Sequence, residues 1–180
     1  MLPITGFGTY RVKDIDVIRT ALSVGYQHID TAELYKNEHL VKQAIDEIDK
    51  TERKIFITTK ISKKSIYSGR IRESWDQRLN IFGSIDLMLL HVPSKDPLRD
   101  WEIFCELYQK HIHLVQWIGV SNYEIQDLEK LKDCPIKPMY NQIEISPFCT
   151  NQRLIEYCNL NQIRIIAHTS LTNGSRFNDQ

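Results

Sequence analysis

The stretch His28-Ile29-Asp30-Thr31-Ala32-Glu33-Leu34-Tyr35-Lys36-Asn37-Glu38 predicts the fold more clearly than any other part of the chain. Its first three residues follow a Gly-Tyr turn and are typical of the end of a short buried strand. Asn37 precedes an apolar helical run and is expected to cap that helix, with Glu38 favourably placed in its first turn. Asp30 and Tyr35 would then project from a strand-to-helix junction, where catalytic groups gather in repeating β/α folds. The alternative is an ordinary loop hydrogen bond, and the other strand ends must decide between the two.

Strand and helix patterns alternate along the whole chain, with short connections and no low-complexity linker. Residues 85–91, for example, form a near-continuous apolar run, as a strand buried on both faces requires. The other strands are expected within residues 6–10, 55–60, 116–120, 139–145 and 163–167. Six helices are expected around residues 15–25, 40–48, 71–83, 101–108, 125–131 and 154–158. This alternation predicts parallel β/α units in one domain.

The expected fold is an incomplete (β/α)8 TIM barrel of about seven β/α units, with the last strand and helices missing. An eight-stranded barrel usually needs roughly 250 residues, and this chain has 180. We expect a barrel domain at residues 1–171 and a polar C-terminal tail at residues 172–180. A monomer is expected, although the unpaired edges of the first and seventh strands would favour self-association.

The composition is ordinary for one globular domain, with 42% hydrophobic and 26% charged residues. The 23 basic and 23 acidic side chains balance, so nothing favours a nucleic-acid or anionic-membrane partner. No apolar run approaches the ~20 residues of a membrane span, and the N-terminus lacks a signal-peptide pattern, so a cytoplasmic protein is expected. The four cysteines form no Cys-x-x-Cys pair and are expected to be buried free thiols. His111 and His113 would point in different directions on a helix. They are expected to face solvent, and no metal site is expected.

Chemically useful side chains stand at three successive strand ends. Asp30 and Tyr35 follow the second strand, Lys60 ends the third and His91 ends the fourth. Lys60 could instead extend along the rim, and His91 could simply cap its strand. In a barrel, however, all four would meet at one mouth.

Together these four groups suit the reduction of a carbonyl compound. A phenol has a pKa near 10 and donates its proton poorly at neutral pH, but a neighbouring lysine cation lowers that pKa. The aspartate would hold the lysine, and the imidazole could hydrogen-bond a carbonyl oxygen. Such a set can protonate an oxyanion as hydride arrives at the carbonyl carbon. The hydride must come from a cofactor, because no side chain supplies one.

The sequence resembles the aldo-keto reductase family over nearly its whole length, and most of all a bacterial branch that reduces 2,5-diketo-D-gluconate and methylglyoxal. The matching segments, in family order, are Gly6-Phe7-Gly8-Thr9-Tyr10-Arg11, residues 25–38, Thr58-Thr59-Lys60, Leu89-Leu90-His91-Val92-Pro93, Ile118-Gly119-Val120-Ser121-Asn122 and residues 141–147. The resemblance implies a TIM barrel of aldo-keto reductase type that reduces small aldehydes or ketones.

The resemblance also implies a role for each site residue. Tyr35 would be the proton donor, Lys60 and Asp30 would tune it, and His91 would orient the substrate carbonyl. The implied cofactor is NADPH, with NADH as an alternative. The residues implied in cofactor binding are Thr9, Asp30, Ser121, Asn122, Gln142, His168, Thr169 and Leu171. The residues implied in binding a small-molecule carbonyl substrate are His91, Tyr10 and Val92.

Three features depart from the family pattern. Val92 stands where the family usually has tryptophan, and His168 stands where a tyrosine commonly stacks on the nicotinamide. The sequence also ends before the segments that grip the 2′-phosphate of NADPH. Losing two or three charge-assisted contacts there would weaken cofactor binding by about a hundredfold or more. Two alternatives therefore stay open: a truncated, non-catalytic relic or binding module, and an isomerase or lyase that uses Lys60 as a Schiff base.

Overall fold

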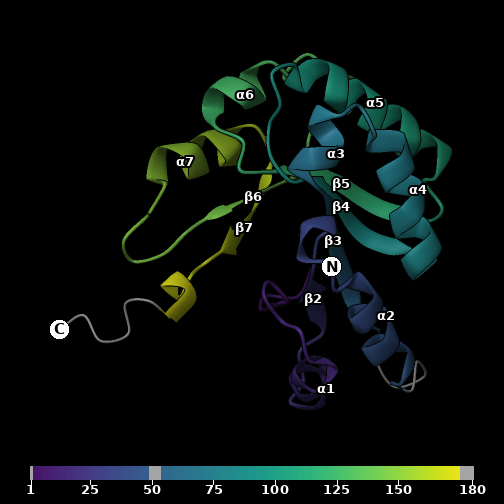
Figure 1. Ribbon diagram of the computed structural model, residues 1–180. Helices are drawn as coiled ribbons and strands as arrows, with labels where there is room; N and C mark the ends of the chain where they lie inside the picture. The colour runs from purple at the N-terminus through teal and green to yellow at the C-terminus, as the bar shows by residue number, and fades with distance from the viewer. Residues whose placement is uncertain (1, 49–53, 175–180) are drawn as a thin grey trace.

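The computed structural model describes residues 2–48 and 54–174. In this range seven strands lie side by side in chain order, every neighbouring pair is parallel, and helices cover the outer side of the sheet (Figure 1). The strands are β1 Phe7–Gly8, β2 His28–Asp30, β3 Phe56–Ile61, β4 Ile85–Leu90, β5 Val115–Ser121, β6 Tyr140–Glu144 and β7 Arg164–His168. This confirms the predicted β/α barrel architecture.

The helices follow the predicted order, with one addition. They are α1 Ile15–Ser23, α2 Glu38–Asp46, α3 Lys63–Tyr67, α4 Ile71–Phe82, α5 Pro97–Lys110, α6 Ile125–Glu129 and α7 Gln152–Leu160, with the short 3-10 helices η1 Glu33–Tyr35 and η2 Thr172–Gly174. The short helix α3 was not predicted, because five residues carry too little apolar periodicity to stand out. Residues 175–180 of the expected polar tail lie outside the described residues.

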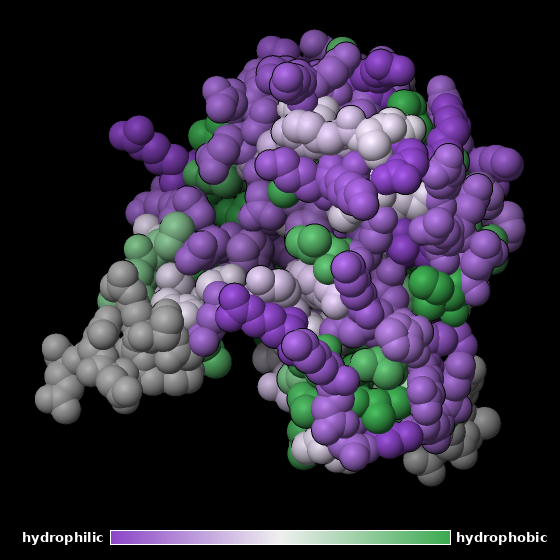
Figure 2. All heavy atoms as spheres, in the orientation of Figure 1, coloured by the Kyte–Doolittle hydropathy of each residue, from purple (hydrophilic) through white to green (hydrophobic). Residues whose placement is uncertain are grey.

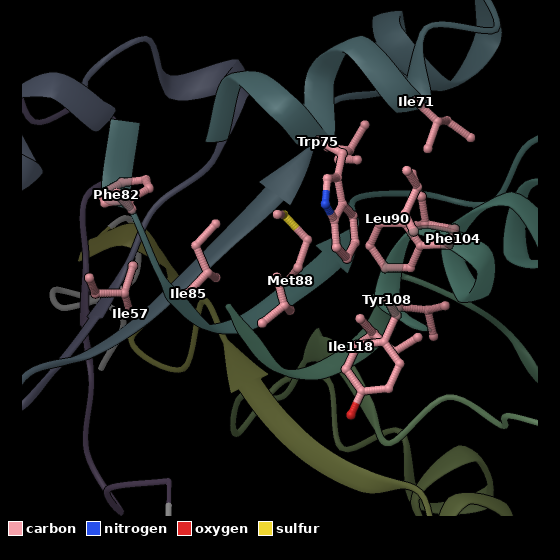
Figure 3. Close-up of a cluster of buried hydrophobic side chains, with 14 of the residues drawn as sticks. Ile57, Ile71, Trp75, Phe82, Ile85, Met88, Leu90, Phe104, Tyr108 and Ile118 are labelled. Atoms are coloured by element: carbon pink, nitrogen blue, oxygen red, sulfur yellow. The ribbon is translucent and has the colours of Figure 1, made fainter. Parts of the chain in front are cut away.

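Alternate residues of the strands face two different layers of the core. In β4, Leu87 and Leu89 pack inside the barrel against Phe56 and Tyr140. Met88 and Leu90 face outward, where Trp75 of α4 and Phe104 of α5 cover them (Figure 3). All six residues of β3 and of β4 are therefore buried, as parallel strands between two packed layers must be.

Close approach of two strands explains the glycine in the middle of β5. A Cβ atom at Gly119 would lie 2.5 Å from the carbonyl oxygen of Tyr140 on β6 and 2.9 Å from the Leu89 side chain. Only a residue without a side chain fits there. Gly119 thus allows β5 and β6 to pair at the end of the strands that carries the polar residues 121 and 142.

The exterior is mainly hydrophilic, with apolar side chains in small separate patches on the face that Figure 2 shows, as is usual for a protein surface. Of the residues that the structure describes, none belongs to a helix long and apolar enough to cross a membrane. The four cysteines are free, but only Cys158 is buried, while the other three are partly exposed.

Two local predictions were wrong. Asn37 stands at the N-cap position of α2, yet its side chain makes no capping hydrogen bond. His111 does not simply face solvent, because Trp75 Nε1 donates a hydrogen bond to its Nδ1 at 3.2 Å. In both cases a partner distant in sequence determines where the side chain lies.

Candidate active site

The four predicted catalytic side chains converge at the carboxyl ends of β2, β3 and β4. Lys60, whose side chain is 1% exposed, donates from Nζ to Asp30 Oδ1 and to the carbonyl oxygen of Thr31, the latter at 3.0 Å. Lys60 Nζ lies 5.2 Å from the centre of the Tyr35 ring. The Tyr35 and His91 rings meet edge to face, with centroids 5.9 Å apart. The alternative of a lysine extended along the rim is therefore wrong.

The environment of Tyr35 changes its pKa in two opposing ways. Burial raises the pKa of the phenol, while the charge of Lys60 and a hydrogen bond with it lower that pKa. The net direction is upward, because burial outweighs the lysine. Lys60 thus lowers the pKa of Tyr35, as predicted, but burial has the larger effect in the free protein. The phenol consequently keeps its proton at neutral pH, as a proton donor requires.

The imidazole of His91 is neutral over the physiological range. Burial, reinforced by the positive charge of Lys60, lowers the pKa of His91 to about 4. Within the described part of the chain its buried Nδ1 has no hydrogen-bond partner. A neutral ring carries one N–H, so His91 can serve as a hydrogen-bond donor without carrying charge.

The lowered pKa of His91 predicts that acid destabilises the fold. In the unfolded chain the imidazole takes up a proton near pH 6.5, whereas in the folded protein it stays neutral down to about pH 4. The stability from this group is therefore present above pH 6.5 and lost as pH falls toward 4. Between pH 7 and pH 5 we expect a loss of roughly 2 kcal/mol from His91. Burial also lowers the pKa values of His28 and His168, which adds in the same direction.

Urea unfolding of the wild type and of His91→Gln, at pH 7 and pH 5, isolates the contribution of His91. The variant should lose less stability than the wild type over this interval, because glutamine does not titrate. The exposed His113 gives a matched control, and His113→Gln should keep the wild-type dependence. Equal slopes for His91→Gln and the wild type would contradict the buried, neutral imidazole.

The predicted cofactor residues of β5, β6 and β7 join the catalytic set directly. Gln142 Nε2 donates to Asp30 Oδ2 at 2.7 Å, so the two oxygens of Asp30 serve Gln142 and Lys60 separately. Asn122 Nδ2 donates to the carbonyl oxygen of His91 at 3.0 Å, and Asn122 Oδ1 lies 3.0 Å from His168 Nε2. Asp30 therefore links Lys60 of β3 to Gln142 of β6. In the same way, Asn122 links the end of β4 to His168 of β7.

This donor set fits a nicotinamide carboxamide, which needs both a hydrogen-bond acceptor and a donor. The hydroxyl of Ser121 and the amides of Asn122 and Gln142 include both kinds of group at one barrel mouth, where they hydrogen-bond one another and Asp30. Of the other predicted cofactor residues, Thr9 is fully buried and donates to the backbone oxygen of Asp30. Thr169 hydrogen-bonds His168, and Leu171 is 69% exposed. Cofactor contacts by these residues stay predictions.

The predicted substrate residues Tyr10 and Val92 lie beside the candidate catalytic residues Tyr35 and His91. Tyr10 is half exposed, and its ring centroid lies 5.2 Å from that of Tyr35. The guanidinium of Arg11 lies over the Tyr10 ring, 5.1 Å from its centroid. Val92 is partly buried and packs on the core beside His91. Tyr10 is thus more exposed than Tyr35, and its contact with a substrate stays a prediction.

A buried polar cluster behind the phenol was not predicted. It joins Glu33 of η1 and Glu38 of α2 to Arg78 of α4. A signal was present in the sequence: Arg78 falls on the apolar stripe of the helix 71–82, four residues before Phe82 and three after Trp75. A charge at such a position indicates a buried partner.

Comparison with known proteins gives a consistent set of similarities. Residues 6–180 match the profile described as the aldo/keto reductase family. The chain is 34% identical to the 9,11-endoperoxide prostaglandin H2 reductase of Trypanosoma cruzi, over 96% of this chain and 63% of that protein. It is 34% identical to the glyoxal reductase of Bacillus subtilis, over 99% and 67%. It is 32% identical to the methylglyoxal reductase DkgB of Salmonella typhimurium, over 99% and 70%.

A solved structure shares the fold. It is that of MGS-M4, an aldo-keto reductase enzyme from a deep-sea metagenome library, with a TM-score of 0.85 and 34% identity. The alignment covers 96% of this chain and 65% of that one. The chain thus spans about two thirds of the length of the proteins it matches.

Proposed function

Because this chain belongs to the aldo/keto reductase family, we propose that it is an NADPH-dependent oxidoreductase that reduces small aldehydes and ketones. The observation that supports this most is the buried ammonium of Lys60, held between Asp30 and the Tyr35 ring, with the neutral His91 against the same phenol. The names of the glyoxal and methylglyoxal reductases favour 2-oxoaldehydes as substrates. NADH is the alternative cofactor, and we expect a cytoplasmic monomer.

In this proposal different residues at the barrel mouth bind the cofactor, orient the carbonyl group and donate the proton. Ser121, Asn122 and Gln142 would hold the nicotinamide, which supplies hydride to the carbonyl carbon when the cofactor is bound. His91, as a neutral donor, would orient the carbonyl oxygen. Tyr35 would then give its hydroxyl proton to that oxygen as negative charge develops there.

Lys60 and Asp30 would act on the phenolate that this proton transfer leaves behind. The ammonium of Lys60 stabilises a negative phenolate oxygen far more than it stabilises the neutral phenol. Asp30 holds that ammonium in place and compensates its charge, since an isolated buried cation would be costly. The pair therefore favours the products of the proton transfer over its starting state, which is what lowers the barrier.

Purified protein mixed with NADPH and methylglyoxal should lose absorbance at the nicotinamide band, and the loss should depend on both enzyme and substrate. NADPH should also raise the melting temperature, because a ligand at 100 times its Kd stabilises a protein by about 2.7 kcal/mol. Absence of turnover at high enzyme concentration, with no thermal shift by either NADPH or NADH, would reject the proposal and favour the non-catalytic alternative.

A further inference from the structure

The short helix that carries Tyr35 is held from one side by the carboxylate of Glu33, two residues before the phenol. Glu33 Oε1 accepts a hydrogen bond from Ser65 Oγ at 2.6 Å. Its Oε2 accepts from the backbone N–H of Ser62 at 2.7 Å and from Ser74 Oγ at 2.9 Å. Burial opposes ionisation of Glu33, but these hydrogen bonds together lower its pKa. A charged, fully hydrogen-bonded carboxylate therefore connects η1 to α3 and α4.

Arg78 fixes the position of this carboxylate from behind. It is 4% exposed, and its Nη1 lies 3.6 Å from Glu33 Oε2. Its Nε donates to Glu38 Oε2 at 3.0 Å, while Nη1 also donates to the carbonyl oxygen of Ser74 at 2.8 Å. Buried ion clusters are rarely more stabilising than apolar packing of the same volume. The fixed geometry that the cluster imposes is thus a better account of its role than stability alone.

Asn37, two residues after Tyr35, holds the other end of the turn. It is 3% exposed, and its Nδ2 donates to the carbonyl oxygens of Thr9 at 2.7 Å and Val12 at 2.9 Å. Its Oδ1 accepts from Thr31 Oγ1 at 3.1 Å. These contacts bind the turn to the loop between β1 and α1, and they explain why Asn37 does not cap α2.

The turn itself has little internal support. Its backbone hydrogen bonds are Tyr35 N to Ala32 O at 2.9 Å and Lys36 N to Glu33 O at 3.3 Å, and such 3-10 bonds have poor geometry. Lys36 closes the turn at φ 58°, a strained conformation for a residue with a side chain. Contacts from outside the turn must therefore determine where the phenol lies.

We propose that Glu33 and Asn37 are positioning residues, which hold the η1 turn from both sides and thereby place the Tyr35 hydroxyl relative to Lys60 and His91. The inference rests on the proposed function, in which this hydroxyl is the proton donor. A displacement of about 1 Å of a reacting group can cost on the order of a hundredfold in rate. Loosening either hold should therefore lower kcat while leaving cofactor binding, which uses β5 and β6, largely unchanged.

Three variants test the Glu33 side. Glu33→Gln places an amide donor among the donors of Ser62, Ser65 and Ser74, and we expect kcat to fall by about 10-fold to 100-fold. Ser65→Ala removes one hydrogen bond but keeps the charge of Glu33, and we expect a loss of about 3-fold to 10-fold. The Kd for NADPH should stay within about twofold in both. The matched control is Glu73→Gln, at an exposed position of α4, the helix that carries Ser74. This variant should behave as the wild type.

The pattern across these variants distinguishes a positioning role of Glu33 from an effect of its charge alone and from a merely structural role. The charge of Glu33 raises the pKa of His91, so the carboxylate could instead act by its charge alone. Loss of kcat in Glu33→Gln with no effect in Ser65→Ala would show that, and would overturn the proposal. A fall in kcat that only follows the folded fraction, measured by thermal melts, would make the cluster merely structural and would overturn it as well.

A readout without turnover tests the Asn37 side and keeps the inference distinct from the proposed function. In protein with 13C-labelled tyrosine, the NMR signal that disappears in Tyr35→Phe belongs to Tyr35. This signal should shift or broaden in Glu33→Gln, Ser65→Ala and Asn37→Asp, and stay in place in Glu73→Gln. A Tyr35 signal that does not move in the first three variants overturns the positioning role. If the wild type reduces no carbonyl compound, the proposed function fails, yet the NMR comparison still decides whether Glu33 and Asn37 help to hold the phenol.

Discussion

Tyr35→Phe is expected to lower kcat for methylglyoxal reduction by about a thousandfold, with the Kd for NADPH changed by no more than about twofold. A positioned general acid typically contributes 10²-fold to 10⁴-fold. The ring of phenylalanine keeps the edge-to-face contact with His91 and the packing against Tyr10, so the pocket should retain its shape. The substitution removes the hydroxyl, and with it the transferable proton and the hydrogen bond with Lys60. Steady-state rates and a fluorescence titration with NADPH would separate the two quantities.

Tyr157→Phe provides the matched control for this substitution. The Tyr157 hydroxyl donates to Glu129 at 2.8 Å, which joins α7 to the end of α6 on the exposed outer side of the barrel. Its loss should leave kcat unchanged. If Tyr35→Phe retained a tenth or more of the wild-type kcat, another group would have to supply the proton, and the assignment of Tyr35 would be wrong.

Lys60→Met is expected to harm both the chemistry and the fold. The substitution leaves the Asp30 carboxylate, whose side chain is 16% exposed, without its cation. Breaking a buried ion pair from one side typically costs about 3–5 kcal/mol. The phenolate of Tyr35 would also lose its counter-charge, so kcat should fall by at least about a hundredfold. Urea unfolding and steady-state kinetics measure the two effects independently.

The double variant Asp30→Asn/Lys60→Met distinguishes an unpaired charge from simple loss of packing. Neutralising Asp30 removes the uncompensated carboxylate, while asparagine can still accept the hydrogen bond from Gln142. The double variant should therefore regain a large part of the lost stability, although its activity should stay low. A Lys60→Met protein as stable as the wild type would contradict a tightly coupled buried pair.

The fold could be predicted because its signals are local. The apolar run at residues 85–91 became β4, and Gly83, at φ 75°, ends α4 where the helical pattern stops. The ends of β4 and β5 are marked by the change from apolar to polar residues, and parallel pairing then brings those ends to one edge. Helix α3 could not be predicted, because its five residues are too few to show a helical period.

The convergence of the candidate catalytic side chains could also be predicted, since Tyr35, Lys60 and His91 follow successive strands. The supporting residues could not, because their partners are distant in sequence. Glu33 and Ser74 are 41 residues apart, and Asn37 and Val12 are 25 apart. Local rules assign an asparagine before a helix to capping, and here the long-range contacts of Asn37 override that rule.

The sharing of Asp30 between two partners has an evolutionary consequence. One oxygen of this carboxylate accepts a hydrogen bond from Lys60 and the other accepts one from Gln142. In the proposed function, a substitution at position 30 would therefore change acid–base chemistry and nicotinamide recognition at the same time. Selection for a different cofactor or a different turnover rate cannot act on this residue for one trait alone. Adaptive substitutions should instead accumulate at positions such as His168, which hydrogen-bonds Asn122 and Thr169, or Val92, which packs on the core.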